Sequence, residues 1–249
     1  MELSKRLQAV ADMVSVGNVA CDAGCDHGYV SIYLVQKRIC PGVIAMDVNA
    51  GPLAQAKAHI DAYGLGKYID TRLSDGVTAL SVGEADSLIL AGMGGRLVIK
   101  ILTDGKEKID HMKELILQPQ SEIEVVRAFL REIGYTISEE NMVYEDGKFY
   151  PMMKATRMSE NKCIGTNEVL KEACVEDSIC QTAYDRYGEL LLKEKHPVLH
   201  QFLIWEQKKD AAVLAALEQG AVKDTLRRQN RLEELRQAER VRACALSHF

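Results

Sequence analysis

The sequence predicts an α/β fold, in which a doubly wound and mostly parallel sheet of seven strands is followed by an all-α domain. Two observations predict this order. Short apolar runs alternate with helical patterns as far as about residue 158, and continuous helical periodicity follows. Such alternation is typical of a parallel sheet covered on both faces, because each crossover helix packs back on the sheet. We therefore expect two domains, residues 1–158 and 159–249.

The first domain is expected to begin with an amphipathic helix, because Leu3, Leu7 and Val10 recur at helical spacing. Helices are also predicted at Pro52–Tyr63 and Ile123–Ile133. Apolar runs predict five buried strands, at Val19–Asp22, Val43–Asp47, Ile69–Ser74, Ser87–Ala91 and Glu114–Gln118.

The ends of the two domains are also predicted from local signals. Two strands, Thr136–Tyr144 and Lys148–Thr156, are separated by Glu145-Asp146-Gly147, which favours a tight hairpin at the end of the sheet. In the second domain, Pro197 suits the first turn of a helix that runs to Leu217. Gly220 interrupts the pattern before a last helix, so we expect an antiparallel coiled-coil hairpin.

Composition excludes several classes of protein. Of the 249 residues, 47% are hydrophobic and 27% charged, which is ordinary for a globular protein. The net charge of −5 provides no overall positive field, so a nucleic acid must bind at a local patch. No run approaches the roughly 20 apolar residues of a membrane helix, and no signal peptide is recognised. The seven cysteines form no CxxC pair, which suits reduced thiols and a cytoplasmic location.

The first chemical motif is the turn Asp22-Ala23-Gly24-Cys25-Asp26-His27-Gly28, directly after the first predicted strand. Ligands of doubly wound sheets bind at this edge, where glycines allow close approach of the backbone. The dinucleotide pattern GxGxxG is absent, and Asp22 would repel a pyrophosphate. A carboxylate here favours a cationic ligand. S-adenosylmethionine, which carries an ammonium and a sulfonium, fits this requirement.

Other strand ends carry further candidates. Asp47, at the end of the second strand, is spaced to accept hydrogen bonds from a ribose, and Asp75 could accept from an adenine amino group. The loop Ala91–Arg96 offers backbone room for a planar ligand, and Gln118 and Gln120 offer amides to a base. The Asn/Asp-Pro-Pro-Tyr motif of many amino-group methyltransferases is missing, which disfavours methylation of an exocyclic amine.

Five motifs in order resemble the bacterial tRNA (adenine-22-N1)-methyltransferase family, TrmK, over residues 1–158 and more weakly through Leu191–Lys195. They are Leu3-Ser4-Lys5-Arg6-Leu7, the DxGxDHG turn, AGMGG at Ala91–Gly95, LQPQ at Leu117–Gln120, and Glu145-Asp146-Gly147-Lys148. The resemblance implies a class I, Rossmann-like methyltransferase domain followed by a coiled coil. It also implies S-adenosylmethionine as cofactor and tRNA as substrate. Asp47 departs from the pattern, because some members carry Glu there.

Motifs and resemblance together define an expected site. For the cofactor we expect Asp22, Gly24, His27, Gly28, Asp47, Val48, Asp75, Gly76, Ala91, Gly92 and Met93. For the RNA we expect Lys5, Arg6, Gly94, Gly95, Arg96, Gln118, Pro119 and Gln120. Asp26 is the expected catalytic base, because it replaces a glycine at the cofactor turn and could accept the N6 proton of adenine.

Alternatives remain open at this point. Asp26 and His27 are also compatible with structural roles at the start of a helix, and Asp22 with a capping role. Lys5 and Arg6 are compatible with a solvated helix face, as are the basic residues of the last helix with a solvated surface. Gly92, Gly94 and Gly95 are compatible with a tight turn. Cys21, Cys25 and His27 lack the usual spacing of zinc ligands, so no metal is expected. A nicotinamide-dependent oxidoreductase is disfavoured by the missing GxGxxG, and a non-catalytic RNA-binding or assembly protein is the main alternative. A monomer without a membrane partner is expected.

Overall fold

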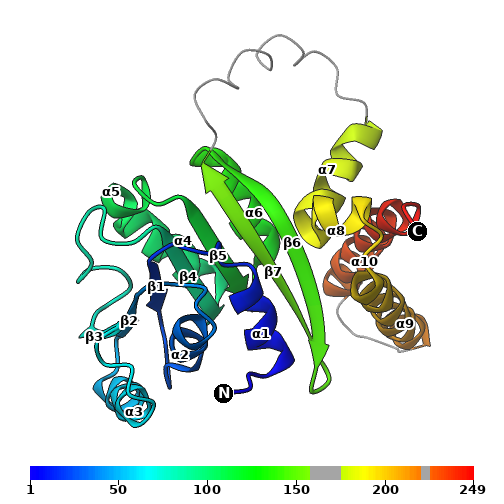
Figure 1. Cartoon of the computed structure of the whole chain (residues 1–249). Coiled ribbons are helices and arrows are strands. Elements are labelled where there is room, and N and C mark those ends of the chain that lie inside the picture. The colour runs from blue at the N-terminus through cyan, green and yellow to red at the C-terminus, as the bar shows by residue number, and fades with distance from the viewer. Residues whose placement is uncertain (158–174, 220–224) are drawn as a thin grey trace. The chain divides into compact units, whose positions relative to one another are not determined.

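The computed structural model describes residues 1–157, 175–219 and 225–249 (Figure 1). The chain divides into two compact units, residues 1–160 and 161–249. The boundary expected between residues 158 and 159 lies outside the described residues.

The first unit is built on a seven-stranded sheet with the order β3-β2-β1-β4-β5-β7-β6. The five strands β3, β2, β1, β4 and β5 pair in parallel, and β7 lies antiparallel between β5 and β6. This confirms the predicted doubly wound sheet that ends in an antiparallel hairpin. The strands are β1 (Ala20–Ala23), β2 (Val43–Asp47), β3 (Ile69–Leu73), β4 (Ser87–Met93), β5 (Glu114–Pro119), β6 (Tyr135–Glu145) and β7 (Lys148–Arg157).

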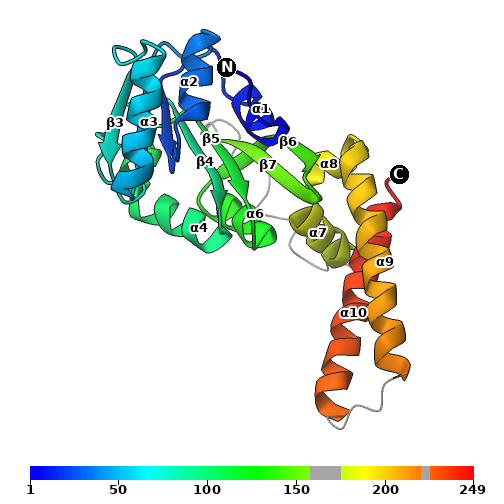
Figure 2. The same ribbon diagram turned by 90° about the horizontal axis from the view of Figure 1, so that it is seen from below.

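Helices cover both faces of this sheet (Figures 1 and 2). They are α1 (Lys5–Asp12), α2 (Tyr29–Gln36), α3 (Ala50–Ala62), α4 (Gly95–Asp104), α5 (Lys106–Ile109) and α6 (Ile123–Glu132). In β4, Leu88 and Leu90 belong to the core beneath α4 and α6, whereas Ile89 belongs to the core beneath α1, α2 and α3. Successive strand residues point to opposite faces, so a strand buried on both faces reads as a continuous apolar run.

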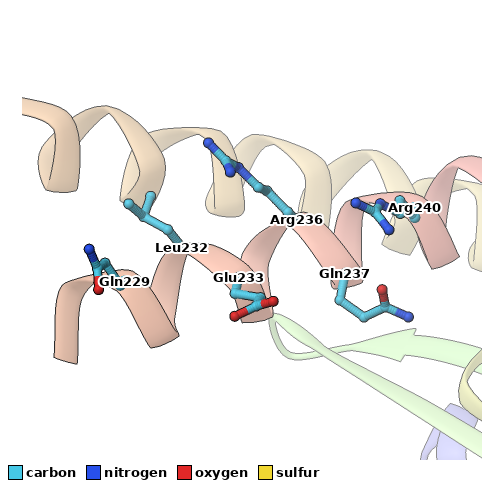
Figure 3. A pocket seen from close by; sticks show the side chains of 6 residues that line it. All are labelled: Gln229, Leu232, Glu233, Arg236, Gln237 and Arg240. Atoms are coloured by element: carbon cyan, nitrogen blue, oxygen red, sulfur yellow. The ribbon is translucent and has the colours of Figure 1, made fainter. Parts of the chain in front are cut away.

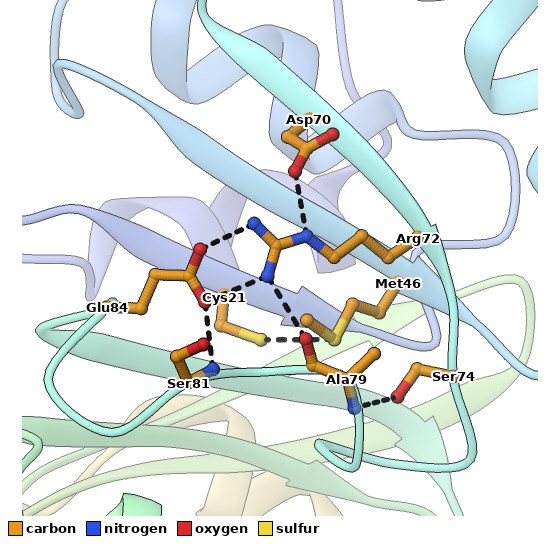
Figure 4. A network of polar contacts seen from close by, with 8 residues as sticks. All are labelled: Cys21, Met46, Asp70, Arg72, Ser74, Ala79, Ser81 and Glu84. Atoms are coloured by element: carbon orange, nitrogen blue, oxygen red, sulfur yellow. Dashed lines mark hydrogen bonds and ion pairs between the residues drawn. The ribbon is translucent and has the colours of Figure 1, made fainter.

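The connection between β3 and β4 has no α-helix, which corrects the expectation that strands and helices alternate throughout (Figure 4). Arg72 holds this connection in place. Its Nε donates to Asp70 (2.7 Å), and its Nη1 donates to the Ala79 carbonyl (3.1 Å) and to Glu84 (2.8 Å). The hydrogen bond from Arg72 lowers the pKa of Glu84 to about 2. Side-chain bonds thus hold a connection that contains no α-helix.

The second unit is helical where the structure describes it. Its helices are α7 (Val175–Tyr187), α8 (Glu189–Lys193), α9 (Pro197–Gln219) and α10 (Thr225–Leu246). The two long helices, α9 and α10, lie side by side (Figure 2). Arg242 of α10 is buried, and its Nη1 approaches the carboxylates of Asp210 (2.5 Å) and Glu206 (3.5 Å) on α9. The predicted break at Gly220 lies outside the described residues.

Candidate active site

The turn after β1 has an unusual backbone. Gly24, Asp26 and Gly28 have φ angles of +82°, +50° and +74°. A side chain is rarely tolerated in this region, and a non-glycine residue there costs on the order of 1–3 kcal/mol. Gly28 also lies close to α3, because a Cβ on it would be 3.1 Å from the Cβ of Ala56. The carboxylate of Asp26 is therefore held on a strained turn where glycine would be easier.

Two buried carboxylates lie at the ends of neighbouring strands β1 and β2. Asp22 is only 5% exposed and accepts a hydrogen bond from the Ser31 hydroxyl (2.6 Å). Burial raises its pKa to about 6, although the Ser31 hydroxyl stabilises the charged form. Asp47 accepts from the backbone N–H groups of Asp26 (3.2 Å) and Asn49 (2.8 Å). Asp47 thus ties the strained turn to β2.

Asp26 itself faces solvent. Its side chain is 71% exposed, and its Oδ1 lies 3.7 Å from Nε2 of His27. The Nδ1 of His27 is buried and has no hydrogen-bond partner among the described residues. Sequence reasoning missed Tyr29 and His59, whose rings stack beside His27 with centroids 5.4 Å apart. No local signal pointed to this contact, because His59 belongs to α3 and meets the turn only in the folded chain.

A second group of predicted residues meets where α1 crosses the ends of β4, β5 and β7. The Oε1 of Gln118 accepts from Nη1 of Arg6 (3.0 Å) and from the N–H of Gly92 (3.2 Å). The guanidinium of Arg6 lies over the ring of Tyr150, 5.5 Å from its centroid. Gln118 is fully buried, whereas Gln120 is exposed. Gln118 therefore contacts its own chain, and the expected contact of its amide with a base stays a prediction.

The glycines after β4 meet the loop after β5. A Cβ on Gly95 would lie 2.5 Å from the Ser121 carbonyl oxygen, so only glycine fits there. The N–H of Gly95 donates to that carbonyl (3.1 Å). Arg96 is 88% exposed and pairs with Glu122 (2.6 Å). This turn is held by backbone packing, and Gly92 and Gly94 before it are exposed.

The structure also describes the surroundings of the other predicted residues. Asp75 is exposed and borders, with Gly76, a small hollow of about 100 Å³ beside α4. Val48 is exposed, and Pro119 is buried in β5. Lys5 is exposed and contributes its N–H, which donates to Glu145 (2.6 Å). The side chain of Met93 lies against the β1 turn, because a Cβ on Gly24 would clash with its Cε.

The second unit has a hollow of its own along α10 (Figure 3). It has a volume of about 450 Å³ and is lined by Gln229, Leu232, Glu233, Arg236, Gln237 and Arg240. Among the residues that the structure describes, no group of three His, Cys, Asp or Glu side chains is placed to hold a metal ion. No helix in the described part of the chain is both long enough and apolar enough to cross a membrane.

The sheet order and the glycine turn with its paired carboxylates define a class I methyltransferase. Residues 3–153 match the model of the family described as "Methyltransferase domain". The tRNA (adenine(22)-N(1))-methyltransferase of Bacillus subtilis is 33% identical over 235 residues, which are 94% of this chain and 93% of that protein. The chain therefore belongs to the tRNA (adenine-22-N1)-methyltransferase family, as the five sequence motifs predicted.

Solved structures agree over nearly the whole chain. The crystal structure of the B. subtilis m1A22 tRNA methyltransferase TrmK is 30% identical and has a TM-score of 0.79, covering 98% of this chain and 99% of that one. Streptococcus pneumoniae Sp1610 in complex with S-adenosyl-L-methionine is 30% identical, with a TM-score of 0.76. It covers 96% of this chain and 99% of its own.

Proposed function

We propose that this chain transfers a methyl group from S-adenosylmethionine to N1 of adenine 22 in tRNA. The observation that carries the proposal is the turn after β1, in a chain that shares 33% identity with a curated enzyme of this activity over 94% of its length. There, the buried Asp22 lies two residues before Gly24 and close to the strained Asp26.

The residues present fit such a cofactor. Burial disfavours the charged form of Asp22, so a cationic group brought next to it would be stabilised by the carboxylate. We infer that Asp22 binds the ammonium end and that Asp47 accepts from the ribose. Gly24 and Gly28 allow the backbone to approach, and Asp75 is available to the adenine amino group. When bound, S-adenosylmethionine supplies an electrophilic methyl group.

Asp26 is our candidate for the general base. Its side chain is exposed at the turn, whereas its own N–H is held by Asp47 (3.2 Å), so the backbone is fixed and the carboxylate is accessible. Methylation at N1 leaves adenine positively charged unless an N6 proton departs. A carboxylate that accepts this proton typically accelerates such a step by about 100- to 10,000-fold.

The tRNA itself would be bound by both units. A target base in a paired stem must flip out to reach the methyl group, which costs a few kcal/mol. Exposed arginines of α10, including Arg236 and Arg240, are suited to phosphate contacts that repay part of this cost. We also propose that the chain acts as a monomer in the cytoplasm.

The test is nucleoside analysis of an unmodified tRNA transcript incubated with the protein and isotopically labelled S-adenosylmethionine. We expect labelled 1-methyladenosine from a transcript with adenine 22, and none from a matched transcript with guanine 22. Binding of the tRNA without any turnover would instead favour the non-catalytic RNA-binding protein. Labelled product from the guanine 22 transcript would contradict the proposed position.

A further inference from the structure

Arg6 differs from the other partly or fully buried arginines of the first unit. In residues 1–157, the arginines that are not exposed are Arg6, Arg72 and Arg127. Arg72 pairs with Asp70 and Glu84, and Arg127 pairs with Glu140 (2.8 Å). Among the described residues, no carboxylate lies within 4.0 Å of the Arg6 guanidinium. Its guanidinium therefore forms no ion pair within the part of the chain that the structure describes.

The partners of Arg6 hold the guanidinium without neutralising it. Nη1 donates to the amide oxygen of Gln118, and the ring of Tyr150 lies beneath the group. The carboxylate of Glu145 does not pair with the guanidinium, because it accepts from the backbone N–H groups of Lys5 (2.6 Å) and Arg6 (3.3 Å). A neutral amide therefore occupies the position where a carboxylate would form an ion pair. Such an arrangement orients a guanidinium and keeps its charge for a ligand.

The guanidinium retains free donors at the edge where the substrate is expected. Neither Nε nor Nη2 has a hydrogen-bond partner in the described part of the chain, and neither is sealed from solvent. Nη1 lies 3.7 Å from where a Cβ on Gly92 would be, at the end of β4. Arg6 thus presents a fixed, partly desolvated cation with two available N–H directions.

We propose that Arg6 binds a backbone phosphate of the tRNA next to the target adenine, and that Gln118 positions it for this contact. This inference rests on the proposed function. A guanidinium is suited to a phosphate because its N–H groups can bond two oxygens at once. Gln118 acts through Arg6, which explains why this residue of the LQPQ motif is fully buried at the carboxyl end of β5.

The carboxylate of the cofactor's methionine moiety is the competing anion, and the sheet order favours the RNA. Asp22 and Asp47, which are suited to the cofactor, lie on β1 and β2. Arg6 contacts residues of β5 and β7, which are on the other side of β4. Arg6 and its ligand therefore lie beside β5 and β7, and β4, which carries the expected cofactor residue Gly92, separates them from the strands of Asp22 and Asp47.

The experiment measures binding of an unmodified tRNA transcript at several salt concentrations, for the full-length chain and three variants. Arg6→Gln removes the cation, and Gln118→Glu keeps both acceptor bonds but places a carboxylate against the guanidinium. We expect each variant to raise the tRNA Kd about tenfold or more. We also expect the slope of log Kd against the logarithm of the salt concentration to fall by about one. Arg38→Gln is the matched control, because Arg38 is exposed and precedes β2 at the opposite edge.

Three further readouts separate the possible roles. Glu at position 118 accepts the same two hydrogen bonds but loses the bond from Nε2 to the Pro119 carbonyl (3.4 Å). Thermal unfolding of Gln118→Glu is therefore measured, and an unchanged midpoint shows that a loss of RNA affinity does not reflect unfolding. Arg6→Lys should keep the salt dependence of the wild type, since the charge remains. S-adenosylhomocysteine affinity, measured by calorimetry, should stay within twofold for all variants.

Unchanged salt dependence in Arg6→Gln would overturn the proposal. So would a loss of S-adenosylhomocysteine affinity with normal tRNA binding, because the ligand would then be the cofactor's carboxylate. If Gln118→Glu lowers the tRNA affinity without changing its salt dependence, Gln118 contacts an RNA base directly and does not act through Arg6. Failure of the wild type to methylate tRNA would contradict the proposed function alone, since the salt dependence reports binding independently of turnover.

Discussion

Replacing Asp22 with Asn removes a buried negative charge from the end of β1 and leaves a side chain of the same shape. Asn can still accept the hydrogen bond from the Ser31 hydroxyl, while the Ser31 backbone N–H, which also stabilises the Asp22 carboxylate, loses a charged acceptor. The variant therefore isolates the charge. We expect it to make the ligand-free protein more stable and to abolish cofactor binding.

The size of the stability change follows from the pKa. Burial raises the pKa of Asp22 from its ordinary 3.8 to about 6. At about 1.36 kcal/mol for each pH unit, the difference between these values corresponds to about 3 kcal/mol. The folded protein binds this proton more tightly than the unfolded chain does, so the stability of the wild type decreases as the pH rises from about 4 to about 6. Above pH 6 the cost of the buried charge remains in full.

Urea unfolding at several pH values measures this effect. We expect Asp22→Asn to exceed the wild type by about 3 kcal/mol at pH 8, and the difference to vanish as the pH falls through 6 to 4. Asp26→Asn is the control, because the exposed side chain of Asp26 should leave the free energy of unfolding within about 0.5 kcal/mol of the wild type.

The same unfolding experiment with S-adenosylhomocysteine present tests whether Asp22 binds the cofactor. S-adenosylhomocysteine at 100 times its Kd should stabilise the wild type by about 2.7 kcal/mol and should leave Asp22→Asn unchanged. If the variant is no more stable than the wild type at pH 8, the burial argument is wrong. If the ligand stabilises both proteins equally, Asp22 does not bind the cofactor.

Three other predictions concern different parts of the chain. Asp26→Asn should slow single-turnover methyl transfer by about 100- to 10,000-fold while cofactor affinity stays within a few-fold, and a near-normal rate would exclude Asp26 as the base. Residues 1–158 should fold alone and bind S-adenosylhomocysteine but lose most tRNA affinity; methylation as efficient as that of the full chain would contradict a role of the helices in RNA binding. Gly95→Ala should lower the free energy of unfolding by about 1–3 kcal/mol in urea, because its Cβ would meet the Ser121 carbonyl at 2.5 Å. Gly51→Ala, which meets nothing within 4 Å, should not lower it.

Local patterns in the sequence determined most of the sheet. The strand Val43–Asp47 lies where its apolar run predicted, because burial on both faces removes the polar alternation of an exposed strand. Glu145-Asp146-Gly147 predicted the hairpin, and Asp146 and Gly147 indeed have positive φ angles of 49° and 77°. The replacement of glycine by Asp26 was also visible in the sequence. These features depend on the chemistry of neighbouring residues, which a single sequence contains.

Tertiary structure alone decided how distant residues combine. The bond from Arg6 to Gln118 joins positions 112 apart, and Glu145 accepts from the N–H of Lys5 across 140 positions. The burial of Gln118 and the missing helix between β3 and β4 depend likewise on contacts made elsewhere in the fold. Hydrophobic periodicity reports which face of a segment is buried, but it carries no information on which side chain arrives from another element. That partner is chosen by the packing of the whole sheet and its helices, and it decides whether a polar residue touches substrate or supports the residue that does.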